Sequence, residues 1–275
     1  MKRYIIIFSF LTIAFQLFAA EQEPGIKQQN LPVQKLPVSG LNSINPDSLI
    51  SHGNADYMKG NYDAAIKAYK SVIDRGYEAA ELYYNLGNAY FKLHNIPHSI
   101  LNYERAKLLD PTNEDIDFNL QKARTYVVDK IDAVPEFIIY KWFRTMINML
   151  PSNSWAIISF FTFVVLLLFL LLYFFTRSIA MKRFSFWISI LFLVIFLVTF
   201  SFSYKRKQFM LNNNGAVIMS PTVTVKGSPN DSGTNLFILH EGTTVNVTDS
   251  LGDWNEIKIR NGNQGWILKS DLERI

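Results

Sequence analysis

The segment from Ala80 to Pro111 reads AELYYNLGNAYFKLHNIPHSILNYERAKLLDP, and much of its pattern already occurs one unit earlier in the chain. An offset of 34 residues pairs identical residues in the two copies: Gly53 with Gly87, Asn54 with Asn88, Ala55 with Ala89, Ile66 with Ile100 and Tyr69 with Tyr103. A period of this length is typical of helix pairs that stack and share one continuous core. Glycine and alanine permit close approach of the helices, and the tyrosine rings fill the gaps between them. The sequence therefore predicts an all-α repeat region.

Other residues of both copies stand at the signature places of the tetratricopeptide repeat, which this region resembles. The second copy supplies Tyr83, Leu86, Gly87, Tyr90, Tyr103, Ala106 and Pro111, and the first keeps Gly53, Gly60, Tyr62, Ala65 and Tyr69. A third helix that starts at Asn113 is expected to cap the stack. We assign residues 47–133 to the repeat region.

The resemblance implies a concave surface, formed by the first helix of each repeat, that receives a segment of a partner protein. Carried over position by position, this surface consists of Asn54, Tyr57, Tyr84, Asn88, Phe91, Phe118 and Lys122. The two asparagines are expected to hydrogen-bond a partner backbone, while the aromatic rings supply anchor area. The alternative is that the rings pack against the chain's own tether or against a helix that starts at Pro135.

The N-terminus has the layout of a signal peptide. Two basic residues at positions 2 and 3 precede an apolar run from Ile5 to Phe15, and small residues precede the polar segment that starts at Glu21. We expect a signal peptide at 1–20 and a flexible linker at 21–46, which is rich in Pro, Gln and Asn. A cleaved signal and an uncleaved anchor both place the following residues outside the cytoplasm.

Two long apolar runs in the second half predict transmembrane helices. Trp155–Phe175 contains no charged residue and extends about 31 Å as a helix, enough to cross the hydrocarbon core of a bilayer. Phe184–Phe202 is a second such run. We place the helices at 153–176 and 184–203, and the connection between them is so short that they must form an antiparallel hairpin.

Basic residues flank the hairpin at both ends, in equal numbers. They are Arg177, Lys182 and Arg183 on one side and Lys205, Arg206 and Lys207 on the other. Since the positive-inside rule does not choose between the ends, the signal peptide decides the orientation. The loop 177–183 is then cytoplasmic, and the linker 204–213 carries a basic cluster that we interpret as a contact for lipid headgroups.

A short amphipathic segment precedes the hairpin, at 134–152. Its apolar residues are Phe137, Ile138, Trp142, Met146 and Met149. Lys141 and Arg144 interrupt them at positions that belong to the other side of a helix. This pattern favours a juxtamembrane helix that lies in the membrane interface, with packing into a protein core as the alternative.

The C-terminal residues 214–275 change to short strand-like runs separated by Gly, Asn, Asp and Ser. Asn261-Gly262 between two such runs is a strong hairpin signal. The segments Glu241–Val245, Gly252–Trp254 and Asn261–Ile267 resemble bacterial SH3-like domains, which implies an all-β barrel. Trp254 and Trp266 are candidates for a peptide-binding platform, and the alternative is that both belong to the core or lip of a small barrel.

Charge and motifs argue against several other functions. The net charge of +4 arises around the predicted membrane helices, where residues 134–213 carry eight basic residues against one acidic residue. Both globular regions are weakly acidic, which argues against nucleic-acid binding. Cysteine is absent, and Pro97 separates His94 from His98 so that they do not align as a metal pair. We find no catalytic motif and therefore predict a protein that is not an enzyme and uses no cofactor or metal.

The order of the segments over nearly the whole chain resembles the BatE family of the bacterial aerotolerance (Bat) operons. The resemblance implies partnership with membrane-anchored von Willebrand factor A domain proteins in an assembly linked to stress tolerance. We therefore expect a multi-domain protein of the bacterial inner membrane, a non-catalytic scaffold whose repeat region and SH3-like domain face the periplasm. The alternative is an envelope sensor whose SH3-like domain binds peptidoglycan peptides.

Overall fold

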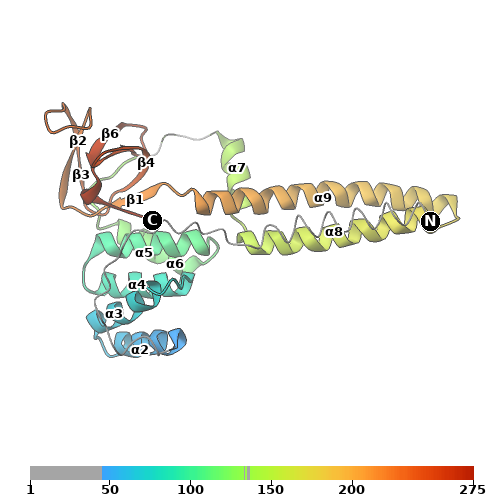
Figure 1. Ribbon diagram of the computed structural model, residues 1–275, viewed down its shortest axis with the longest axis horizontal. Coiled ribbons are helices and arrows are strands. Elements are labelled where there is room, and N and C mark those ends of the chain that lie inside the picture. Colours follow the sequence, from blue (N-terminus) through green and yellow to red (C-terminus); the bar gives the residue numbers. More distant parts are fainter. Residues whose placement is uncertain (1–44, 133, 135–136) are drawn as a thin grey trace. The chain divides into compact units, whose positions relative to one another are not determined.

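The structure is a computed structural model that describes residues 45–132, 134 and 137–275 (Figure 1). The predicted signal peptide and nearly all of the predicted linker 21–46 lie outside the described residues. The expected fold class is confirmed. Helical repeats come first, two candidate membrane helices follow, and an antiparallel sheet forms the C-terminal domain.

Residues 45–132 form the helical repeats. The helices are α2 (Pro46–Met58), α3 (Tyr62–Ile73), α4 (Ala80–Lys92), α5 (Ile96–Leu109) and α6 (Glu114–Arg124). Asparagine stands at the N-cap of four of them, and in three its Oδ1 accepts backbone N–H groups that have no partner within the helix. Asn45 accepts from Asp47, Asn95 from His98, and Asn113 from both Asp115 and Ile116. The predicted capping helix is α6, which begins directly after Asn113 as expected.

The expected role of the repeated glycines is confirmed. A Cβ atom at Gly53 would lie 2.6 Å from the ring of Tyr69, and one at Gly87 would lie 2.7 Å from the ring of Tyr103. Real Cβ atoms do not approach other atoms so closely, so only glycine admits each ring. Both tyrosine side chains are in consequence buried, with 1% of their surface exposed. This contact locks the two helices of each repeat together.

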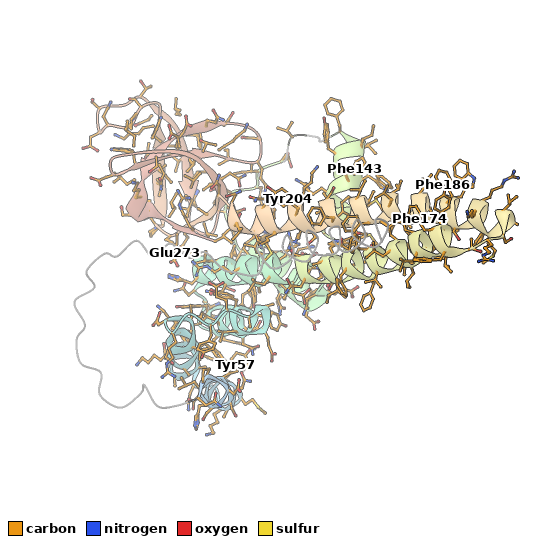
Figure 2. All side chains as sticks on the ribbon, turned by 45° about the vertical axis from the view of Figure 1, so that its right-hand side comes forward. Tyr57, Phe143, Phe174, Phe186, Tyr204 and Glu273 are labelled. Carbon is orange, nitrogen blue, oxygen red and sulfur yellow. The ribbon has the colours of Figure 1, made fainter. Side chains whose placement is uncertain are left out.

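Helices α8 (Ser152–Phe175) and α9 (Ile179–Leu211) form the hairpin, and each is long and apolar enough to cross a membrane. Aromatic side chains such as Phe174 and Phe186 project from its surface (Figure 2). Two reciprocal hydrogen bonds join the helices at one end: Ser152 Oγ donates to the Ser203 carbonyl at 3.3 Å, and Ser203 Oγ donates to the Ser152 carbonyl at 3.2 Å. The segment expected as a linker, 204–213, continues helix α9 as far as Leu211.

One residue of the basic cluster after the second helix was wrongly assigned to lipid headgroups. Arg206 is 2% exposed, and its Nη2 donates to the Leu108 carbonyl at 2.7 Å. That carbonyl lies in the last turn of α5, where carbonyls have no partner within the helix and the helix dipole attracts a cation. Arg206 Nη1 also donates to Asn148 Oδ1 at 3.3 Å. The guanidinium therefore serves a structural junction.

Residues 215–274 form a seven-stranded antiparallel sheet with the strand order β3-β2-β6-β5-β4-β1-β7. The strands are β1 (Gly215–Ile218), β2 (Thr222–Lys226), β3 (Asn235–His240), β4 (Thr244–Leu251), β5 (Trp254–Lys258), β6 (Gln264–Leu268) and β7 (Leu272–Arg274). The predicted hairpin joins β5 and β6, with Gly262 at φ +94°. One buried apolar cluster contains residues of strands from both ends of this order: Val225 of β2 and Leu239 of β3 at one end, and Ile218 of β1 at the other. The sheet is thus barrel-like, consistent with the SH3-like fold expected.

Gly87→Ala tests the glycine–tyrosine contact. The added methyl group would overlap the Tyr103 ring, and overpacking of this kind costs typically about 1–3 kcal/mol. Alanine returns up to ~1 kcal/mol through its higher helix propensity, so we expect a net loss of about 1–2 kcal/mol in the stability of α4 and α5. Native-state hydrogen exchange of the α4 and α5 amides in the full chain would measure it.

The matched control is Ala55→Ser, which adds one atom at an exposed position of α2. It should change the opening free energy by no more than about 0.5 kcal/mol. Unchanged amide protection in Gly87→Ala would contradict the packing role of this glycine.

Candidate partner-binding site

The first and second repeats build the same hydrogen-bonded group of three side chains. In the first, Asn54 Oδ1 accepts from the Tyr69 hydroxyl at 2.7 Å and from Asn85 Nδ2 at 3.3 Å. In the second, Asn88 Oδ1 accepts from the Tyr103 hydroxyl at 2.6 Å and from Asn119 Nδ2 at 3.2 Å. The second group lies 34 residues further along the chain at every position.

Asn85 and Asn119 were missed by sequence reasoning, although they obey the same offset of 34 residues as the pair they contact. Each connects the first helix of one repeat to the next helix of the same kind, because Asn85 lies on α4 and Asn119 on α6. The offset alone could have identified them as members of the site.

These contacts leave the Nδ2 group of each central asparagine, with its two N–H donors, for a ligand. The Oδ1 atoms of Asn54 and Asn88 are occupied, whereas within the described residues their Nδ2 groups make no hydrogen bond to the protein. Both side chains are partly exposed. An amide that is fixed through its oxygen presents its N–H groups in a defined direction, and a partner's backbone carbonyl is the natural acceptor.

The predicted aromatic residues are only partly brought together with the asparagines. Tyr84 lies beside them, because its hydroxyl accepts from Asn119 Nδ2 at 2.8 Å. Phe91 makes an edge contact with Tyr126 at 5.6 Å between ring centroids, and Lys122 Nζ lies 5.5 Å from the Phe91 centroid.

The two remaining aromatic residues of the predicted surface differ from each other in exposure. Tyr57 turns toward Tyr62, with the ring centroids 5.3 Å apart, and is half-buried (Figure 2). Phe118 is 68% exposed, which leaves most of its surface free for a partner. Tyr57, Tyr84 and Phe91 therefore pack partly on their own repeats, and Phe118 is the most accessible anchor of the predicted set.

The alternative in which a helix after Pro135 covers these rings does not hold for the described part of that segment. Helix α7 (Ile138–Ile147) has no buried residue. The tether that was the other possible cover lies outside the described residues.

The two tryptophans of the C-terminal domain do not lie in its core. Asn255 and Ile257 of β5 are buried, so the side chains that alternate with them along the strand, Trp254 and Glu256, belong to the opposite face of the sheet. On β6, Gly265 and Ile267 are buried and Trp266 belongs to the outer face likewise.

On that outer face the two indoles occupy diagonal positions across a strand pair. Trp254 lies opposite Leu268, and Trp266 lies opposite Glu256. Both indoles are half-buried, so part of each ring is held by the sheet and part remains accessible to a peptide. The sequence alone could have indicated the outer position of Trp254, because the apolar Ile257 and Ile259 occupy the alternate positions of the same run.

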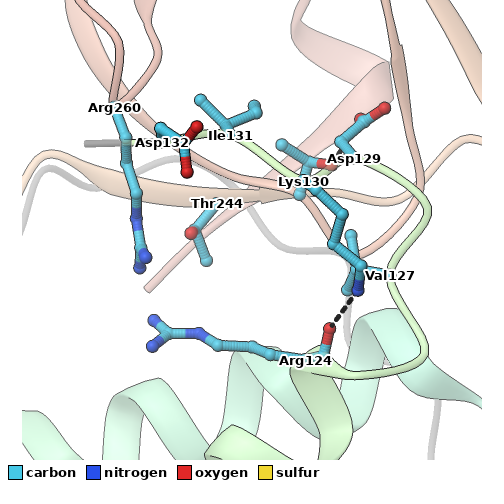
Figure 3. Close-up of a pocket in the computed structure, with 10 residues that line it drawn as sticks. Arg124, Val127, Asp129, Lys130, Ile131, Asp132, Thr244 and Arg260 are labelled. Carbon is cyan, nitrogen blue, oxygen red and sulfur yellow. Dashed lines mark hydrogen bonds between the residues drawn. The ribbon is translucent and has the colours of Figure 1, made fainter. Parts of the chain in front are cut away.

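A cavity of about 290 Å³ lies between the segment after α6 and the sheet (Figure 3). Asp129 closes one side: its Oδ2 accepts from the His240 backbone N–H and from Thr243 Oγ1, both at 2.7 Å, and its Oδ1 lies 2.8 Å from His240 Nδ1. Burial raises the pKa of Asp129, but hydrogen bonds from Thr243 and His240 outweigh it and lower the pKa below its usual value. The segment is thereby fastened to the turn between β3 and β4.

Two guanidinium groups face the same cavity, from Arg124 and Arg260 (Figure 3). Burial, and next the charge of Arg124, lower the pKa of Arg260, while Glu104 opposes this shift and pairs with Arg124. Asp129 and Asp132 also line the cavity. Lys130 lines the cavity as well, so three basic residues face two acidic ones, while Glu104 pairs with Arg124.

Comparison with protein families agrees with the geometry of the repeats. Residues 53–94 match the family described as TPR repeat, and residues 80–113 match the family described as tetratricopeptide repeat. A search of the curated proteins finds no match for this chain. Residues 53–113 are thus tetratricopeptide repeats, and repeats of this class act as scaffolds for protein–protein interaction.

The Tyr69 hydroxyl gives the site a measurable pH dependence. Burial raises the pKa of Tyr69 to about 12, with smaller contributions from Tyr57, Asp56 and Glu81. Because the folded pKa lies above the unfolded value of 10.0, this residue contributes stability that is complete below pH 10 and is lost as the pH rises toward about 12. Two pKa units correspond to roughly 2–3 kcal/mol.

We expect the phenolate absorbance of the full chain to show a late step near pH 12, accompanied by loss of helical circular dichroism. The step should be smaller in Tyr69→Phe, where Tyr103 still titrates late because burial raises its pKa as well. Tyr77→Phe, which removes an exposed tyrosine nearby, should leave the late step in place. A titration in which Tyr69→Phe and the wild type coincide would contradict the burial of the Tyr69 hydroxyl.

Proposed function

We propose that the chain is a membrane-anchored, non-catalytic scaffold that binds protein partners through its tetratricopeptide repeats. The observation that carries this proposal is the repeated asparagine group, which presents the Nδ2 groups of Asn54 and Asn88 one repeat apart. A partner backbone in extended form offers carbonyls along its length to such a row of donors. Phe118 and Phe91 supply apolar anchor area near the second donor.

The membrane anchor in this proposal is the hairpin of α8 and α9. Two antiparallel spans return the chain to the side from which it came, and the serine pair joins the two ends at that side. The repeats before the hairpin and the sheet after it then face the same compartment. The signal-peptide pattern at 1–20 supports the extracytoplasmic side of a bacterial inner membrane.

The partner class follows from the resemblance to the BatE family. We propose membrane-anchored von Willebrand factor A domain proteins of a Bat-type stress assembly as the partners of the repeats. The spans suit this assignment, since two proteins anchored in one membrane meet at a high effective concentration.

Asn54→Asp combined with Asn88→Asp is the sharpest test of the repeat surface. The exchange keeps the oxygen that accepts from Tyr69 and Tyr103, and replaces the outward donor by an acceptor that repels a partner carbonyl. Two lost hydrogen bonds at about 0.5–1.5 kcal/mol each predict that the affinity for the partner falls roughly 5- to 150-fold. Co-purification of von Willebrand factor A domain proteins with the tagged full chain from native membranes would measure it.

Asn61→Asp is the control for the type of exchange, because it adds one negative charge at the exposed N-terminus of α3, against two in the double variant. Phe118→Ala should weaken co-purification without a change in melting temperature, since this ring is largely exposed. If the Asn54→Asp, Asn88→Asp variant co-purified as much partner as the wild type, or if its melting temperature fell strongly, the assignment would be refuted.

A second candidate function rests on the outer face of β5 and β6. The half-buried Trp254 and Trp266 favour an envelope sensor whose SH3-like domain binds peptidoglycan peptides. On this hypothesis the detergent-solubilised full chain co-sediments with purified cell-wall sacculi, and Trp254→Ala with Trp266→Ala abolishes the co-sedimentation. Ile238→Ala, which removes an exposed apolar side chain of β3, should leave it intact. A wild-type chain that stays in solution would refute the sensor hypothesis.

A further inference from the structure

Helix α7 presents an uncovered apolar face. In an α-helix, residues one, four and five positions apart from the first share one side, and here these positions are Ile138, Ile139, Trp142 and Phe143. They are 84%, 68%, 57% and 48% exposed, respectively. Figure 2 shows Phe143 on this helix. Lys141 lies on the opposite side of the helix.

The exposure of this face is costly in water. Burying an apolar side chain of this size contributes about 1.5–3 kcal/mol, and contiguous apolar patches on soluble surfaces mark a contact site. The four side chains are too close in sequence to be scattered surface residues. Something outside the described residues must therefore cover them.

Hydrogen bonds hold the C-terminal end of α7 at one end of the hairpin. Trp155 Nε1, in the first turn of α8, donates to the Ile147 carbonyl at 3.0 Å. The next residue, Asn148, accepts from Arg206 of α9. Only residues 148–151 separate α7 from α8. The helix that carries the apolar face is thus fixed to the end of the hairpin where Ser152 pairs with Ser203.

We propose that α7 docks on the membrane surface, with Ile138, Ile139, Trp142 and Phe143 inserted at the boundary between lipid headgroups and acyl chains. The inference rests on the proposed role of the hairpin as a membrane anchor. A helix fixed to the end of a spanning hairpin lies at the level of that boundary, where Trp and Phe are favoured. Lys141 on the other side suits anionic headgroups.

This docking gives the anchor a second function. A helix in the interface resists rotation and tilting of the hairpin, because its apolar face would leave the lipid. The segment between the repeats and the hairpin is then held at the membrane surface, which limits the distance at which the repeats reach a partner.

The absence of cysteine makes a clean labelling experiment possible. Single cysteines would replace Ile139, Lys141 and Leu168 in the full chain, each carrying a nitroxide spin label in nanodiscs of phosphatidylcholine and phosphatidylglycerol. Ile139 and Lys141 are two residues apart and lie on nearly opposite sides of α7, so they form a matched pair. Leu168 is an exposed residue in the middle of α8 and reports on the span. The measured quantity is the accessibility of each label to oxygen relative to a water-soluble nickel chelate.

We expect the label at Ile139 to show an oxygen-to-nickel ratio several times that at Lys141, at a depth of about 5–10 Å below the headgroups. A high ratio at Leu168 with equal, water-like ratios at Ile139 and Lys141 would overturn the docking of α7 while leaving the anchor intact. Exclusion of both reagents at Ile139 would overturn it too, in favour of a protein that covers the face. A water-like ratio at Leu168 would instead refute the membrane anchor itself.

Discussion

The contact between a glycine of one helix and a tyrosine ring of the next determines both the packing and the candidate site of the repeats. Because Gly87 has no Cβ, the Tyr103 ring lies against α4, and its hydroxyl then reaches Asn88, the residue that follows the glycine. The same hydroxyl fixes the oxygen of that asparagine and leaves its amide for a partner. Gly53 and Tyr69 do the same for Asn54. The packing of the repeats and the geometry of the candidate site therefore depend on one interaction that occurs in each repeat.

A buried arginine, Arg206, connects the repeats to the hairpin through hydrogen bonds to both. Arg206 has no carboxylate partner within the described residues and is almost fully buried, a costly state for a charge. The carbonyl at the end of α5 and the side chain of Asn148 compensate for part of that cost. Removal of a guanidinium in such a position leaves acceptors unsatisfied, so this residue holds α5, α9 and the end of α7 in one junction.

Much of the fold could be predicted from the sequence, since period and turn residues act locally. The 34-residue offset, the apolar runs and Asn261-Gly262 each predicted an element that the structure contains. The prediction that Arg206 contacts lipid headgroups was wrong because the charge of a side chain does not reveal which carbonyl lies within its reach. The assignment of Trp254 to a core was an open alternative that the strand alternation excludes, since the residues next to it are the ones that point inward.

The sequence by itself determined the order of the parts, because helical period, apolar length and strand alternation are properties of neighbouring residues. Only the tertiary structure decided which of the surface groups remain free. Asn85 and Asn119 take up the oxygens of Asn54 and Asn88 from the next helix, and Tyr57 turns toward Tyr62 whereas Phe118 stays exposed. Hydrogen bonds and ring contacts of this kind join residues far apart in the chain, so the distances that decide them exist only once the helices have packed.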